Sequence, residues 1–154
     1  MTEEYLAVIL LIERLHRHFL DVVKLELDRF GVRDSNNVQA VMLFNVGDAE
    51  MTVGELTLRG CYLGSNVSYN LKKLVENGYV EQARSQHDRR SVHVRLSPKG
   101  RALRDRLAEM HRRHAESLSQ NTITESDLEH AAGTLRRLER FWIRAGDETR
   151  RVAA

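Results

Sequence analysis

The sequence predicts a mainly α-helical fold that carries one small β-hairpin. Three observations support this class. The 154 residues include one proline and nine glycines, so few positions favour turns. Apolar residues recur at helical spacing along most of the chain. Residues 79–85 and 91–97 are typical of strands instead, since Val92, Val94 and Leu96 in the second segment alternate with polar side chains.

Length and composition limit the class of protein. A chain of 154 residues corresponds to about one domain, residues 1–154, and is long enough to bury a core. No run approaches the ~18 apolar residues of a membrane span. Acidic and basic residues flank the short apolar run 6–12, which is wrong for a signal peptide, so we expect a cytoplasmic protein. The single cysteine, Cys61, excludes an intrachain disulfide.

The first part of the chain predicts two helices. Residues 4–30 are apolar on more than one side, as in a helix that is buried on more than one side. Gly31 can end this helix. Ser35 or Asn36 can cap a second helix, which Gly47 closes.

Two shorter helices are expected next. Thr52, with Glu55 three residues later, forms a capping-box pattern for a helix from Val53 to about Arg59. After a turn, Ser65 is expected to cap a helix that ends at Gly78. One face of that helix is apolar and should meet the core: Val67, Leu71, Leu74 and Val75. The other face is polar and basic, with one acid: Ser65, Asn66, Tyr69, Lys72, Lys73 and Glu76.

The order of these elements, helix, strand, basic turn and strand, is that of a winged helix. Such a domain sets one helix into a DNA groove and a hairpin beside it. The tip of the hairpin is the sequence Gln86-His87-Asp88-Arg89-Arg90. Arginine there can enter the narrow, electronegative minor groove, while Asp88 is expected to pair with a neighbouring arginine and shape the tip. A solvated helix face and a plain charged hairpin remain the alternatives.

The charge distribution agrees with a polyanionic partner. Residues 1–58 carry 5 Lys or Arg against 10 Asp or Glu. Residues 59–106 carry 11 against 4, a balance of +7, and residues 107–154 carry 8 of each. A net charge of only +2 therefore conceals one basic segment, which is the electrostatic footprint of a nucleic-acid-binding protein.

The C-terminal third predicts two more helices. Ser97 as N-cap and Pro98 at the first helical position start one that runs to about Ser119. Thr124 with Asp127 caps the last helix. Its apolar residues follow heptad-like spacing: Leu128, Ala131, Leu135, Leu138 and Trp142. We expect the tail after Ala145 to be frayed.

Several motifs now resemble one family. The wing sequence Asp88-x-Arg90, followed by Leu96-Ser97-x-x-Gly100, and the helix pattern Val67-Ser68, Leu71-x-x-Leu74-x-x-x-Gly78, Tyr79-Val80 are similar to those of MarR-type transcriptional regulators. The resemblance covers essentially the whole chain. Ser97 replaces the usual threonine and keeps its capping hydroxyl. Tyr69 stands where the family often carries a basic residue.

The resemblance implies a homodimeric DNA-binding regulator. It implies a winged helix lobe at about 35–97 and dimerisation helices at about 4–30 and 98–145. Two lobes would address successive major grooves of a near-palindromic operator in double-stranded DNA, with half-sites about one helical turn apart. The family is often repressive, and a small aromatic or phenolic effector often relieves the repression. The stretch 60–82 is similar to an alphaproteobacterial subgroup tied to cell-envelope and stress genes.

The candidate site residues fall into two groups. For DNA we predict that Ser65, Asn66, Ser68 and Tyr69 approach bases or phosphates, that Lys72 and Lys73 neutralise phosphates, and that Arg89 and Arg90 place the wing, with Arg84, Gln86 and His87 nearby. For the effector, family geometry implies a pocket lined by His16, Phe19, Met42, Asn45 and Tyr62. Simple packing is the alternative for these five.

Other classes of function find less support. A zinc-responsive regulator of the same fold is suggested by seven histidines, two of them spaced as His111-x-x-His114, but zinc needs three or four converging ligands. No phosphate loop, HExxH motif or nucleophile with a nearby base is present, so we expect no enzyme and no cofactor. A winged helix that contacts only proteins is the third alternative, although such domains often lose the basic wing.

Overall fold

The computed structural model describes residues 1–60, 64–84, 91–120 and 123–152. The chain forms two compact units, Met1–Met110 and His111–Ala154. Within the described residues, no helix combines the length and the apolar character that a membrane crossing requires.

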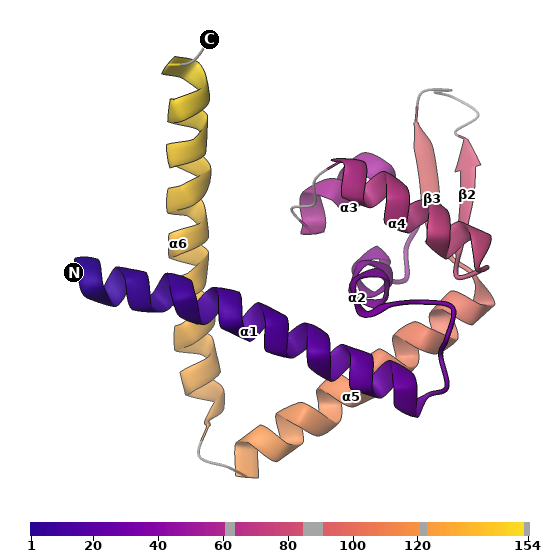
Figure 1. The fold of residues 1–154 in the computed structure, drawn as a ribbon, viewed down its shortest axis with the longest axis horizontal. Coiled ribbons are helices and arrows are strands. Elements are labelled where there is room, and N and C mark those ends of the chain that lie inside the picture. Colours follow the sequence, from indigo (N-terminus) through magenta and orange to yellow (C-terminus); the bar gives the residue numbers. More distant parts are fainter. Residues whose placement is uncertain (61–63, 85–90, 121–122, 153–154) are drawn as a thin grey trace. The chain divides into compact units, whose positions relative to one another are not determined.

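The first unit is built from four helices and the start of a fifth, as Figure 1 shows: α1 (Thr2–Arg29), α2 (Asn37–Val46), α3 (Val53–Gly60), α4 (Gly64–Glu76) and α5 (Pro98–Gln120). Their ends follow the predicted signals. Gly31 has φ +71° after α1, and Gly47 has the same φ after α2. Asn36 caps α2 through two reciprocal hydrogen bonds. Its side chain accepts one from the backbone N–H of Gln39, and the Gln39 side chain accepts one from the backbone N–H of Asn36.

The capping box of α3 is confirmed, but the start of α4 differs from the prediction. The Glu55 carboxylate accepts from the Thr52 backbone at 2.7 Å, and the Thr52 hydroxyl accepts from Glu55 N at 3.1 Å. Helix α4 begins at Gly64, so Ser65 lies in its first turn and is not the cap. A serine near a helix start fixes the boundary only to within one or two residues, since it also fits the first turn.

The end of α4 is a Schellman motif around Gly78. Gly78 N donates to Val75 O at 3.0 Å, and Tyr79 N donates to Leu74 O at 2.8 Å. Gly78 has φ +75°, which side chains with a Cβ rarely adopt. This turn sends the chain directly from α4 into β2, the first strand of the hairpin.

A three-stranded antiparallel sheet follows, with the order β1-β3-β2. Its strands are β1 (Met51–Thr52), β2 (Val80–Arg84) and β3 (Val92–Leu96). The predicted hairpin is confirmed, and its register pairs Val80 with Leu96 and Arg84 with Val92. The sequence did not reveal β1, in which Met51 pairs with Val94, because two residues are too short to show an alternation.

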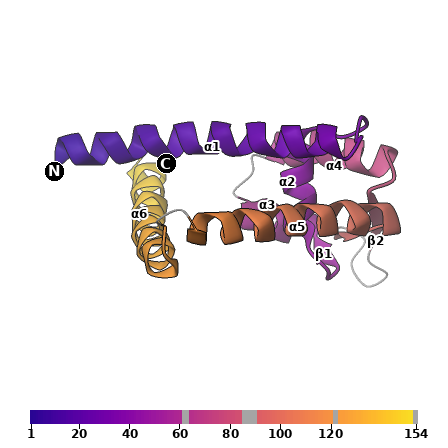
Figure 2. The same ribbon diagram turned by 90° about the horizontal axis from the view of Figure 1, so that it is seen from below.

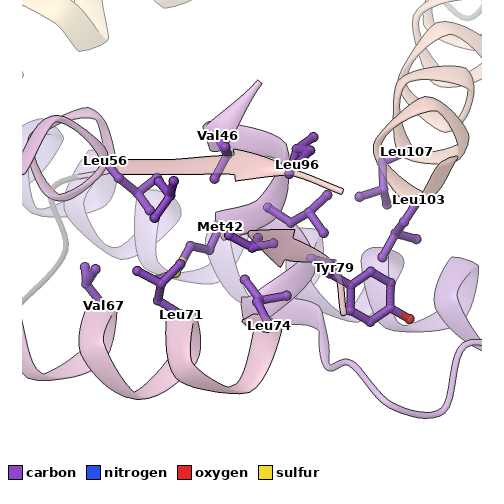
Figure 3. Packing of buried hydrophobic residues seen from close by; sticks show 14 of the residues in the cluster. Met42, Val46, Leu56, Val67, Leu71, Leu74, Tyr79, Leu96, Leu103 and Leu107 are labelled. Atoms are coloured by element: carbon purple, nitrogen blue, oxygen red, sulfur yellow. The ribbon is translucent and has the colours of Figure 1, made fainter. Parts of the chain in front are cut away.

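The core of the first unit surrounds α2. Ala40, Met42, Leu43 and Val46 of this helix have no exposed surface. In Figure 2, α2 lies between α1 and α5. Figure 3 shows the buried side chains that meet it from α3, α4, the sheet and α5, among them Leu56, Val67, Leu71, Leu74, Leu96, Leu103 and Leu107. Complete burial of a leucine contributes roughly 1.5–3 kcal/mol, so the inner face of α4 is firmly held.

Only the C-terminal part of α1 joins this core. Val23 and Leu27 are buried, but the apolar residues of its earlier turns are not. Leu6, Leu10 and Leu15 are each more than half exposed. The expected burial of this helix on more than one side is therefore not met within this chain.

The second unit holds the end of α5 and helix α6 (Glu125–Val152). The predicted cap of α6 is confirmed, since the Asp127 carboxylate accepts from Thr124 N at 2.8 Å. The expected fraying after Ala145 is wrong: α6 continues to Val152, because this stretch contains no proline to interrupt it. Leu128, Leu135 and Trp142 form its apolar stripe and are 39–48% exposed.

Candidate nucleic-acid interface

Helix α4 separates its side chains as predicted. Val67, Leu71 and Leu74 are buried against the core, and Val75 is half-buried. Ser65, Asn66 and Lys72 are exposed on the other side. Tyr69 is 62% exposed on the same side. The exposed face therefore presents hydroxyl, amide, phenol and ammonium groups, which suit base edges and phosphates.

Two polar side chains of α4 bond to the helix itself. The Ser68 hydroxyl donates to Gly64 O at 3.0 Å, and the Asn70 amide donates to Asn66 O at 2.9 Å. Asn70 is only 8% exposed, so it belongs to the buried side of the helix. Ser68 is exposed and keeps its acceptor capacity for another group.

The two lysines of α4 share one carboxylate. Lys73 Nζ lies 3.0 Å from Glu76 Oε2, and Lys72 Nζ lies 3.8 Å from Glu76 Oε1. The hydrogen bond from Lys73 lowers the pKa of the Glu76 carboxyl, and the same bond raises the pKa of the Lys73 ammonium. Glu76 and Lys73 are therefore both charged at neutral pH.

A groove of about 840 Å³ runs between α4 and the sheet. Its polar lining comes from Thr52 of β1, from Ser68, Lys72 and Glu76 of α4, from Gln82 of β2 and from Ser91 before β3. The structure thus brings two predicted residues, Ser68 and Lys72, together with Gln82 and Ser91, which sequence reasoning missed. Gln82 could have been found from the period of two along β2, because it stands two residues before Arg84.

Gln86, His87, Asp88, Arg89 and Arg90 lie outside the described residues, so their roles stay predictions. Arg84, the last residue of β2, is exposed and stands opposite Val92 in the register. Strands β2 and β3 lie beside α4, as Figure 1 shows.

A polar cluster supports the turn between α4 and β2. The Tyr79 hydroxyl donates to Asp34 Oδ1 at 2.5 Å, and Lys99 Nζ donates to Asp34 Oδ2 at 2.5 Å and to Asn77 O at 2.8 Å. Lys99, followed by Tyr79, lowers the pKa of the Asp34 carboxyl. Burial, followed by the bond to Asp34, raises the pKa of the Tyr79 phenol. These bonds join the loop after α1, the end of α4 and the start of α5.

The motif Leu96-Ser97-x-x-Gly100 holds the same turn through hydrogen bonds to Gly78 and Tyr79. Ser97 N donates to Tyr79 O at 3.0 Å, and the Ser97 hydroxyl donates to Gly78 O at 2.5 Å while accepting from Gly100 N at 3.0 Å. A Cβ on Gly100 would lie 2.0 Å from Tyr79 O. The glycine is therefore required by the close approach of α5 to the backbone that follows the recognition helix.

The predicted effector residues occupy different environments. His16 is exposed on α1, and Phe19 is 37% exposed. Met42 of α2 has no exposed surface and packs in the hydrophobic core of the first unit. Asn45 is half-buried, and its carbonyl accepts from Arg59 Nη1 at 2.9 Å. Tyr62 lies outside the described residues, so the structure does not complete this pocket.

The zinc alternative depends on histidines that converge with other ligands. Over the part of the chain that the structure describes, no group of three His, Cys, Asp or Glu side chains is placed to hold a metal ion. Burial lowers the pKa of His111, and the neighbouring His114 lowers it further. His93 instead contacts Glu50, with Nδ1 2.9 Å from Oε1.

Comparison with known proteins agrees with this geometry. Residues 36–100 match the model of a winged helix DNA-binding domain. The exopolysaccharide II synthesis transcriptional activator ExpG of Rhizobium meliloti (strain 1021) is 41% identical over 138 residues, which cover 90% of this chain and 71% of that protein.

Solved structures share the fold at lower identity. Streptococcus pneumoniae FabT in complex with DNA matches with a TM-score of 0.72 and 22% identity, over 90% of this chain and 96% of that one. A mutant of MarR from E. coli complexed with operator DNA matches with a TM-score of 0.73 and 20% identity, over 90% and 97%. The chain belongs to the MarR family of winged helix, DNA-binding transcriptional regulators.

Proposed function

We propose that this regulator binds a near-palindromic operator as a homodimer, with α4 in the major groove and the wing in the adjacent minor groove. The observation that carries the proposal is the exposed polar and basic face of α4 beside the groove between α4 and the sheet. A helix fits the major groove, where each base pair presents its own set of donors and acceptors.

The proposed contacts divide by their chemistry. Ser65, Asn66, Ser68 and Tyr69 approach base edges or the nearest phosphates, while Lys72 and Lys73 neutralise phosphates. Arg84 and the wing residues Gln86, His87, Arg89 and Arg90 contact the next minor groove, and Asp88 shapes the wing. Since the partner is chromosomal DNA, we place the protein in the cytoplasm.

The dimer is supported by apolar surface that one protomer leaves exposed. Leu6, Leu10 and Leu15 of α1 and Leu135 and Trp142 of α6 are all more than a third exposed. Each of these two helices therefore carries an exposed apolar stripe, and exposed apolar surface is characteristic of association sites. With the family resemblance, it supports dimerisation through the first, fifth and sixth helices, so that half-sites lie about 10 base pairs apart.

The direction of regulation has two candidates. The general resemblance implies repression by occupying a promoter. The relative ExpG, at 41% identity, is named an activator of exopolysaccharide II synthesis. Because that likeness covers 90% of the chain, we propose activation as the second candidate. A reporter gene behind the operator, with and without the regulator, separates the two by the sign of the change.

The effector proposal rests on the resemblance. A small aromatic or phenolic compound would act through His16, Phe19, Met42, Asn45 and Tyr62. It must bind one spacing of the two DNA-binding lobes better than the other, since equal affinity shifts nothing. Titration of such compounds into the protein–operator complex tests this: release of DNA supports it, and unchanged occupancy across the series opposes it.

The central experiment is operator selection from a random duplex library, followed by footprinting and measurement of the mass of the complex. We expect an enriched near-palindrome that holds one dimer, with two protected half-sites about one helical turn apart. Enrichment of a single half-site that holds a monomer would contradict the dimeric proposal. Absence of any enriched sequence would contradict sequence-specific binding.

A further inference from the structure

Glu76 is the only acidic residue of α4, and it lies on the proposed DNA-binding side of the helix. Its two carboxylate oxygens face two different lysines. Oε2 accepts from Lys73 Nζ at 3.0 Å, and Oε1 lies 3.8 Å from Lys72 Nζ. Both residues to which we assign phosphate contacts are therefore paired with a carboxylate in the free protein.

Helix stability does not account for this acid. A carboxylate in the last turn faces the negative end of the helix dipole, which is unfavourable. A lysine placed four residues before a glutamate is also the weaker of the two orientations for an i,i+4 pair. The side chains of Lys72, Lys73 and Glu76 are 74%, 43% and 44% exposed, so solvent screens the pairs.

The position of Glu76 matters more for the DNA than for the helix. Glu76 and Lys72 line the groove between α4 and the sheet together with Ser68, Gln82 and Ser91. If α4 occupies the major groove and the hairpin the adjacent minor groove, the phosphate backbone that separates these grooves must pass between them. Lys72, Gln82 and Ser91 offer it donors, whereas Glu76 repels it.

We propose that Glu76 restrains DNA affinity by holding Lys72 and Lys73 and by placing a negative charge beside the phosphate path. This inference rests on the proposed DNA contacts of the two lysines. To bind phosphates, the lysines must first break their ion pairs with Glu76. The free energy lost in breaking these pairs offsets part of the free energy gained from the phosphates. Binding to random duplex depends almost entirely on phosphate attraction. Glu76 is therefore expected to lower the affinity for random duplex by a larger factor than the affinity for the operator.

The test compares Glu76→Gln with a matched control, Glu81→Gln, in salt-series titrations with a random duplex. Both changes remove one negative charge. Glu81 is 46% exposed and is also paired, with Arg95 at 2.8 Å, but it lies on β2 and holds neither lysine. Each of these two substitutions is also introduced separately into a variant that carries both Lys72→Ala and Lys73→Ala. Thermal unfolding and circular dichroism establish that each variant is folded.

We expect Glu76→Gln to raise the affinity for random duplex about fivefold to tenfold near 0.1 M salt and to steepen the salt slope by about one, as for one added phosphate contact. Glu81→Gln should change the affinity for random duplex and its salt slope much less. In the double-alanine background the gain from Glu76→Gln should disappear.

Three results would overturn the inference: no gain from Glu76→Gln, an equal gain from Glu81→Gln, or a gain that persists without the lysines. The last two would show a general effect of charge. If the double-alanine variant weakens binding while Glu76→Gln has no effect, the inference fails and the proposed contacts stand. If the double-alanine variant binds like the unaltered protein, the inference about Glu76 and the proposed phosphate contacts of the lysines both fail.

Discussion

The Tyr79 hydroxyl donates a hydrogen bond to the Asp34 carboxylate, at an O···O distance of 2.5 Å, and so joins residues 45 positions apart. Tyr79 follows the recognition helix directly, while Asp34 belongs to the loop before α2. Lys99 completes the contact from α5, with its ammonium also 4.1 Å from the centre of the Tyr79 ring. The turn at the end of α4 is therefore tied by side-chain bonds to the loop after α1 and to the start of α5.

This cluster predicts a dependence of stability on pH. The pKa of the Asp34 carboxyl is lowered in the folded protein, mainly by Lys99. Its contribution is therefore complete above the unfolded pKa of about 3.9 and is lost as the pH falls through the lower, folded pKa. In urea titrations, the difference in unfolding free energy between the unaltered protein and Asp34→Asn should be constant above about pH 5 and shrink below about pH 4. A difference that stays constant to pH 3 would contradict the role of this ion pair.

Gly100→Ala should destabilise the lobe. The new methyl group would meet Tyr79 O, which belongs to backbone and cannot rotate away. Overpacking of this kind costs about 1–3 kcal/mol or more, measurable as a lower urea midpoint. Gly133→Ala is the control, since nothing lies within 4 Å of a Cβ there. That change should be neutral or stabilising by about 0.5–1 kcal/mol, and equal losses in both variants would show that the contact with Tyr79 is unimportant.

Lys72→Ala should weaken binding to all duplexes alike. A phosphate contact carries no sequence information, so operator and random duplex should lose affinity by similar factors. The slope of log affinity against log salt should become about one unit shallower. Lys24→Ala, at an exposed position of α1, is the matched loss of charge and should leave the slope unchanged. A loss confined to the operator would mean that Lys72 reads bases instead.

Arg90→Ala should reduce affinity for the operator by roughly 1–3 kcal/mol. This prediction rests on the sequence, because Arg90 lies outside the described residues. An arginine in a narrow minor groove gains from its enhanced negative potential, so the loss should be larger where the flanking sequence is an A-tract. Binding isotherms on operators with A-tract and G·C-rich flanks would show this. Unchanged affinity on both would remove Arg90 from the interface.

The sequence was sufficient where the determinants are local. The Thr52–Glu55 and Thr124–Asp127 caps, the turn at Gly78 and the alternation through Val94 each depend on a few neighbouring residues, and the structure confirms them. The inner face of α4 was likewise visible from its 3.6-residue period.

Contacts between distant segments could not be predicted in this way. Strand β1 exists only because Met51 meets Val94 across the sheet. The bond between Asp34 and Tyr79 and the place of Gln82 in the groove depend equally on the tertiary fold. The exposed turns of α1 show the same limit: their apolar pattern indicates burial, but Leu10 stays 60% exposed among the described residues of the chain.

A salt-series titration of the purified protein against its own upstream DNA, with a random duplex of equal length, tests the central claim most directly. The account predicts tight binding of one dimer to a near-palindrome in the upstream DNA, weaker binding to the random duplex, and a steep decrease of both affinities with salt as phosphate contacts release counterions. Equal and weak affinities that do not change with salt would contradict it, because the basic face of α4 would then not be in contact with DNA.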